Sequence, residues 1–174
     1  DYYASRGLGD VYKRQGIRYD VIDAVLSSEI NDISDMHLRA TELNNWLDKD
    51  ELVEMLTAFN RVSTLAQKAV SSDVNEQLLT EDAEINLYKE FNNIKVKVKE
   101  LLNDKKYSEA LDSFASLRPS IDAMFDSVMV MDKDEAIKNN RLGLLKQIYD
   151  TMLSICDLSK ICLLYTSDAA DDGE

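Results

Sequence analysis

The chain has 174 residues, 45% of them apolar, with 20 Lys and Arg against 33 Asp and Glu and a formal net charge of −13. A chain of this length is expected to form one domain with its own core. Five Gly and one Pro are too few for the turns of a β-sandwich or barrel, so the composition predicts an all-α fold. One His and two Cys exclude a disulfide framework and the usual zinc ligand set.

Both ends of the chain lack the helical pattern found between them. Residues 5–15 read SRGLGDVYKRQ, and residues 162–172 read CLLYTSDAADD. Both resemble translated adapter DNA from short-read sequencing, in which GAT GTG TAT AAG AGA CAG encodes DVYKRQ and the reverse complement encodes the C-terminal run. We therefore expect residues 1–15 and 162–174 to be disordered, adapter-derived tails rather than native ones. The natural segment, residues 16–161, then carries 17 Lys and Arg against 27 Asp and Glu, a net charge of −10.

Apolar residues at helical spacing predict about six helices. The first is short and covers residues 20–26. The second covers residues 34–47, with Ser34 as its capping residue. A third follows Asp48 or Asp50 and forms a helical hairpin with the second.

The second half of the chain begins with a polar connection, residues 71–82, whose two leucines are expected to lie under the bundle. A fourth helix then shows an apolar stripe over residues 87–101. The fifth carries one apolar face over residues 107–128 through Pro119, so it should be kinked or re-initiated there. With a sixth helix at the end, these elements predict a compact bundle.

Acidic residues gather where helices are predicted to begin. Asp132 with Glu135 three residues later resembles a capping box for the sixth helix. Asp48 with Asp50, or Asp132 with Asp134, could in principle hold a metal or perform acid–base chemistry. Helix capping explains these pairs better, because carboxylates are favourable at helix N-termini.

No motif in the chain predicts catalysis. There is no glycine-rich phosphate loop and no nucleophile elbow, His37 has no second histidine, and Cys156 falls among apolar residues like a packed thiol. We expect no cofactor and no metal. No run of 18 apolar residues and no signal peptide is present, which predicts a cytoplasmic location and no membrane partner.

A basic stretch, residues 89–106, departs from the acidic average with a local charge of +3. The overall acidity argues against indiscriminate binding to nucleic acid, DNA included, because such binding needs positive charge. A local patch can still bind RNA, and the alternative is ordinary solvated surface. The candidate RNA contacts are Lys95, Lys97, Lys99, Lys105 and Lys106.

Several short motifs occur in a fixed order along the chain. They are RYD at 18–20, IDAV at 22–25, NRVS at 60–63, LRP at 117–119, VMVM at 128–131, NRL at 140–142 and DLS at 157–159. In this respect the natural segment resembles the C-terminal end of the bacterial glycyl-tRNA synthetase beta-subunit family.

The resemblance implies an α-helical anticodon-binding domain of the DALR type, although no clear DALR tetrad is present. It implies a cytoplasmic enzyme of alpha and beta subunits, a heterotetramer in which the alpha subunit uses ATP and glycine and the beta subunit recognises tRNA. This segment would itself be non-catalytic. Arg61 and Arg141 match family positions and are candidate tRNA contacts; the alternative is that both brace helix packing through acidic neighbours.

The leading hypothesis is therefore a module that binds the anticodon arm of the tRNA for glycine. One alternative is a helical scaffold that contacts the alpha subunit or neighbouring beta-subunit domains, which the acidic net charge favours. Another is the tail of arginyl-tRNA synthetase, which shares the fold but usually ends in an aromatic or methionine signature that this chain lacks.

Overall fold

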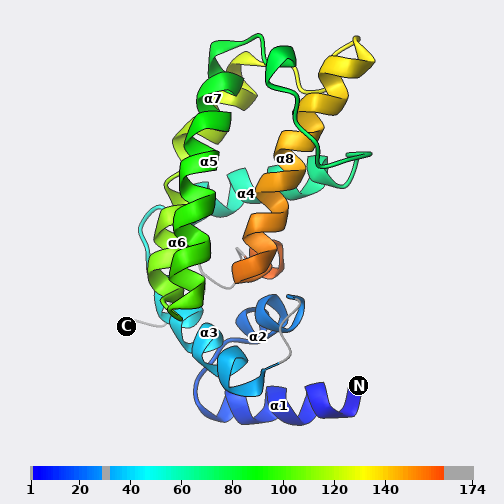
Figure 1. The fold of residues 1–174 in the computed structure, drawn as a ribbon. Coiled ribbons are helices and arrows are strands. Elements are labelled where there is room, and N and C mark those ends of the chain that lie inside the picture. Colours follow the sequence, from blue (N-terminus) through cyan, green and yellow to red (C-terminus); the bar gives the residue numbers. More distant parts are fainter. Residues whose placement is uncertain (1, 29–31, 163–174) are drawn as a thin grey trace, which may run out of the picture.

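The computed structural model describes residues 2–28 and 32–162, and every regular element in these two ranges is helical (Figure 1). The predicted all-α class is confirmed. The α-helices are α1 (Tyr2–Arg14), α2 (Tyr19–Leu26), α3 (Ile33–Trp46), α4 (Leu52–Ala66), α5 (Asp82–Asn103), α6 (Tyr107–Ala115), α7 (Arg118–Ser127) and α8 (Glu135–Ile155), with short 3-10 turns η1 (Glu76–Leu78) and η2 (Leu158–Lys160).

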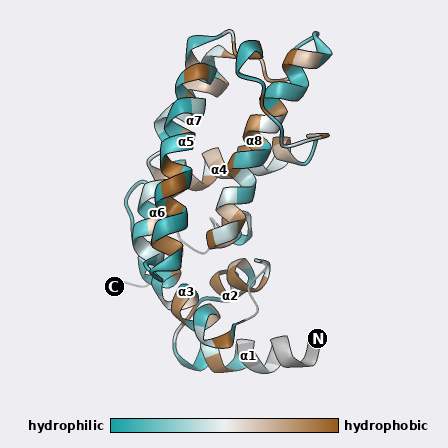
Figure 2. Ribbon diagram, viewed as in Figure 1, coloured by the Kyte–Doolittle hydropathy of each residue, from teal (hydrophilic) through white to brown (hydrophobic). Residues whose placement is uncertain are grey.

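The bundle has a long upper part and a smaller base. Helix α5 lies alongside α6 and α7, α4 crosses the bundle and packs mainly on α8, and α1, α2 and α3 form the base (Figure 1). Hydrophobic and hydrophilic residues alternate along the ribbons of α2 to α8 (Figure 2). The rings of Phe59 on α4 and Phe114 on α6 stack with centroids 4.6 Å apart, so aromatic packing joins the crossing helix to the upper part.

The N-terminal residues differ from the expected disordered tail, because they form helix α1. Its Tyr12 is only 2% exposed, and the Tyr12 ring lies 5.3 Å from the ring of His37 on α3. Burial of a large aromatic side chain against the base is sufficient to hold this segment in place. The helix says nothing about the origin of residues 1–15, which stays a prediction, and residues 163–174 lie outside the described part of the chain.

Two helix caps differ from the sequence prediction. Asp32 caps α3 by accepting a hydrogen bond from the Ser34 backbone N–H (2.9 Å), so Ser34 receives the cap instead of providing it. Helix α8 is capped by Asp134, which accepts from two backbone N–H groups, and not by Asp132. In both places an Asp two residues from the predicted cap has the extended backbone that a capping residue needs.

Pro119 re-initiates the fifth predicted helix instead of kinking it. Helix α6 ends at Ala115, and α7 begins at Arg118 with Pro119 in its first turn. A proline is tolerated there because the first N–H groups of a helix have no intrahelical acceptor. The break gives one helix more than expected within residues 16–161.

The connection between α4 and α5 is held against α8. The Asn140 amide accepts from the Asn75 backbone N–H (2.6 Å) and donates to the Asn75 carbonyl (3.0 Å), and Gln147 donates to the Ser72 carbonyl (2.6 Å). Gly143 lies between these two side chains on α8, where an added Cβ would overlap the carbonyl oxygen of Asp73. As predicted, Leu79 is buried beneath this connection, while Leu78 is half-buried.

Gly143→Ala should therefore lower the free energy of unfolding by about 1–3 kcal/mol, because the Asp73 backbone has to move away from α8. Glycine to alanine inside a helix ordinarily raises stability by about 1 kcal/mol, so the expected sign is reversed. Urea denaturation measures the difference. The control is Asn139→Ala on the same helix, which should raise stability slightly; a stabilising effect of Gly143→Ala would contradict the close contact.

Candidate functional site

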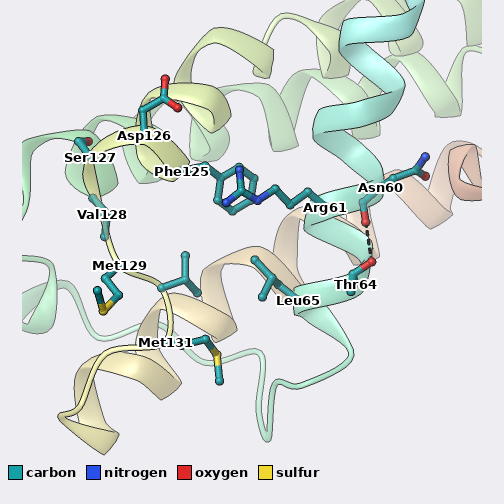
Figure 3. Close-up of a pocket in the computed structure, with 11 residues that line it drawn as sticks. Asn60, Arg61, Thr64, Leu65, Phe125, Asp126, Ser127, Val128, Met129 and Met131 are labelled. Atoms are coloured by element: carbon teal, nitrogen blue, oxygen red, sulfur yellow. Dashed lines mark hydrogen bonds between the residues drawn. The ribbon is translucent and has the colours of Figure 1, made fainter.

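A groove lies between α4 and the segment that follows α7. We call it the Arg61 groove; it has a volume of about 780 Å³ and is formed by residues 60–65 of α4 and by residues 125–131 (Figure 3). In Figure 3, Phe125, Leu65, Met129 and Met131 surround this space. The lining is mostly apolar.

The VMVM run forms one wall of the groove; its backbone is extended at Val128 and bends at Val130 and Met131. Val128 has backbone angles of −123° and 128°, and side chains of an extended segment alternate between opposite faces. Val128 and Val130 are each 7% exposed and belong to the core, whereas Met129 is 69% exposed and Met131 is 44% exposed. Sequence reasoning did not predict this wall, because four apolar residues in a row give no sign of which ones face the solvent.

Arg61 is exposed and lies over the ring of Phe125, with its guanidinium carbon 4.3 Å from the ring centroid (Figure 3). This distance is typical of a cation–π contact. The expected alternative, in which Arg61 braces packing through acidic neighbours, is not what the structure shows, since its contact is aromatic. The other four arginines of residues 16–161, all described, pair with carboxylates: Arg18 with Asp20, Arg39 with Asp35, Arg118 with Asp122, and Arg141 with Glu84.

Arg141 is a buried structural residue, which corrects its assignment as a candidate tRNA contact. Its side chain is 5% exposed and donates to Glu84 (2.9 Å), to Asp132 (3.3 Å) and to the carbonyl of Met129 (2.8 Å). The guanidinium is therefore already engaged inside the protein. For Arg141 the alternative of bracing through acidic neighbours is the correct one.

The five candidate lysines are all exposed, and none forms a salt bridge within the described residues. Lys95 and Lys99 lie one helical turn apart and line a second groove of about 490 Å³ between α5 and α8. Lys97 does not line this groove, and Lys105 and Lys106 lie at the turn after α5. The lysines thus spread around the end of α5, and their groove shares no lining residue with the Arg61 groove.

Glu84 is fully buried at the start of α5 and accepts hydrogen bonds from the backbone N–H groups of Thr80 (2.7 Å) and Glu81 (2.9 Å) as well as from Arg141. Burial alone would raise the pKa of Glu84. The hydrogen bonds from Arg141 and the two backbone groups outweigh it, so the pKa lies below the ordinary value of 4.5. Glu84 is therefore ionised at neutral pH and matches the charge of Arg141.

Because the folded state lowers the pKa of Glu84, its ionisation stabilises the protein above the unfolded pKa, and this contribution is lost as the pH falls through the lowered value. Glu84→Gln should cost on the order of 3 kcal/mol near pH 7, where it removes the buried counter-charge of Arg141 and leaves only the partly exposed Asp132. Its unfolding free energy should then fall less between about pH 5 and pH 2.5 than that of the wild type.

Urea denaturation across this pH range measures both effects. The control is Asp150→Asn, which removes a half-exposed carboxylate paired with Lys146 and should keep the wild-type pH dependence. Equal pH dependence of the wild type and Glu84→Gln would contradict the role given to Glu84.

Lys105 has a left-handed backbone with φ of 58°, directly after the end of α5. A residue with a Cβ pays about 1–2 kcal/mol for this conformation. Lys105→Gly should therefore raise the unfolding free energy by on the order of 1 kcal/mol, whereas Lys105→Ala, which removes the charge but keeps the Cβ, should not. Thermal unfolding of both variants tests this, and equal effects would show that the backbone conformation is not strained.

The described residues contain no cluster of three or more His, Cys, Asp or Glu side chains placed to hold a metal ion. Cys156 is buried, as expected for a packed thiol, and burial raises the pKa of this thiol to about 12. None of the helices in the described ranges combines the length and apolar character needed to span a membrane.

Comparisons with known proteins agree with one another. Residues 51–163 match the model of a family described as the DALR anticodon binding domain. The glycine–tRNA ligase beta subunit of Clostridioides difficile is 75% identical over 152 residues, which cover 87% of this chain and 22% of that protein. The same subunit of Desulforamulus reducens is 37% identical over 154 residues, 88% of this chain and 22% of that protein. The chain thus spans about a fifth of the length of these relatives.

Proposed function

The chain belongs to the DALR anticodon binding domain family, and from this premise we propose that it binds the anticodon arm of the tRNA for glycine. The observation that carries the proposal is the set of lysines at the end of α5. All five are exposed and form no salt bridge in the described structure, although the chain as a whole is strongly acidic. Free cations of this kind are what a phosphate backbone requires.

The acidity of the rest of the chain restricts where the tRNA binds. A net charge of −13 repels a polyanion from most of the surface, so contact is limited to places where positive charge is locally in excess. The lysines at 95, 97, 99, 105 and 106 form one such place. Arg61 offers a single exposed cation elsewhere, in a groove that Asp126 also lines.

In the relatives this segment is part of a longer protein, and the proposal extends to such a longer protein here. That protein would be the beta subunit of a cytoplasmic glycine–tRNA ligase, which works with an alpha subunit to attach glycine to tRNA with the use of ATP. The segment itself would contribute binding and no chemistry. The competing proposal is a scaffold that contacts the alpha subunit or other beta-subunit domains, and the acidic net charge of the chain favours it.

Binding of the tRNA for glycine, measured over a series of salt concentrations, tests the proposal. Reversing Lys95, Lys97 and Lys99 to Glu should weaken binding and should reduce the slope of log K against log salt by about 2–3, close to one unit for each lost phosphate contact. A complete beta subunit should show the same salt dependence of tRNA binding as the wild-type chain.

The matched control reverses three exposed lysines elsewhere that form no salt bridge in the described structure, Lys68, Lys133 and Lys160, and so changes the net charge by the same amount. It should weaken binding much less than reversal at the end of α5. Equal losses in the two triple variants would show a general charge effect and would contradict the assigned surface. Crosslinking of the segment to the alpha subunit alone would favour the scaffold.

A further inference from the structure

We infer that the Arg61 groove takes one unstacked nucleobase, which stacks on the free face of the Arg61 guanidinium. The inference rests on the proposed function and adds a second, chemically different contact to it. In this arrangement the lysines at the end of α5 hold phosphates, and the Arg61 groove holds a base.

The charge of Arg61 carries the first step. It is the arginine of residues 16–161 whose guanidinium meets an aromatic ring and no carboxylate, while the other four in that range are ion-paired. Within the described residues no carboxylate forms an ion pair with Arg61, although Asp126 lines the same groove, so the positive charge is presented at the edge of a largely apolar groove. Such a charge complements a ligand that is both anionic and flat, and a nucleotide is such a ligand.

The geometry of the groove carries the second step. Phe125 covers one face of the Arg61 guanidinium and so orders this flexible side chain before a ligand arrives (Figure 3). RNA bases that are splayed out of the helical stack are commonly held on aromatic rings and on guanidinium planes. The exposed side chains of Met129 and Met131 supply polarizable apolar surface on another part of the lining of the same groove. A volume of about 780 Å³ lies within the range of about 300–1,000 Å³ typical of small-ligand sites.

Other occupants fit the groove less well. An isolated phosphate would meet one cation and also Asp126, which lines the same groove and repels it. An apolar helix from another protein would cover the methionines but would also bury the charges of Arg61 and Asp126, which form no ion pair with each other, and burial of unpaired charges is costly. A base leaves the guanidinium stacked between two π-systems with its edge open to water, so the desolvation cost is smaller.

The wall of the groove is fixed from inside the protein. Arg141 donates to the carbonyl of Met129, and Val128 and Val130 are inserted into the core on either side of it. Met129 and Met131 therefore project outward from a segment that cannot turn over without breaking the buried contacts of Arg141. A preformed wall lowers the entropy cost of binding a base.

The experiment combines protein variants with tRNA for glycine that carries a single abasic nucleotide at each anticodon-loop position in turn. Arg61→Lys keeps the positive charge but loses the planar surface, so binding to intact tRNA should weaken by about tenfold. At one loop position the abasic tRNA should bind the wild type about tenfold more weakly, and Arg61→Lys should then add little further loss. Phe125→Leu should give the same coupling, and circular dichroism establishes that both variants are folded.

The control is Lys68→Ala, which removes an exposed cation just after α4 that does not line the groove. The fold-loss of tRNA affinity caused by Lys68→Ala should multiply with the fold-loss caused by the abasic nucleotide at every position, because the two changes act independently. Two results would overturn the base site while leaving tRNA binding by the lysines intact. One is that the fold-loss of affinity of Arg61→Lys multiplies with the fold-loss of the abasic nucleotide at all positions, and the other is that Arg61→Lys binds intact tRNA with wild-type affinity. If the wild type does not bind tRNA, the proposed function is overturned as well. If Met129→Lys no longer assembles with the alpha subunit but still binds tRNA normally, the groove binds a protein and not a base.

Discussion

The buried ion pair between Arg141 and Glu84 determines how the upper part of the molecule is assembled. It joins α8 to the start of α5, and through the Met129 carbonyl it also fixes the segment between α7 and α8. A buried pair of charges contributes little net stability compared with an apolar substitute, because both ions lose water. What it supplies is a single allowed arrangement, since any shift of one helix would leave a charge unpaired. The alternation of buried valines and exposed methionines in residues 128–131 depends on that arrangement.

Most of the helices could be predicted from sequence because each buries one face, and a buried face leaves a regular apolar spacing. The residues at which the helices begin were harder to predict. Two polar residues that lie two positions apart can each cap a helix, and backbone geometry decides which one does: Asp32 and not Ser34 for α3, and Asp134 and not Asp132 for α8. The docking of residues 71–75 on α8 was not predictable either, because it depends on Gly143 and Asn140 meeting a segment about 70 residues away.

The sequence could predict some of the residues of the candidate site but not how they are arranged in space. Counting charges identified the lysines at the end of α5, and a charge excess on the surface survives folding because lysine is seldom buried. Arg61 and Arg141 had equal standing in the sequence, yet one is exposed on an aromatic ring and the other is engaged inside the core. The difference comes from their neighbours in space, Phe125 and Glu84, which are far from them in the chain.

The C-terminal end of the described chain returns to the base of the molecule, where it meets the start of α2. The backbone N–H of Cys162 donates to the Asp20 carboxylate (2.9 Å), and Arg18 donates to the Cys162 carbonyl (3.4 Å). The VMVM segment and the start of α8 lie at the opposite end of the bundle (Figure 1). A surface tether attached through the exposed thiol of Cys162 would therefore hold the molecule by its base, with the VMVM wall of the Arg61 groove at the end away from the support and accessible to a macromolecule as large as a tRNA.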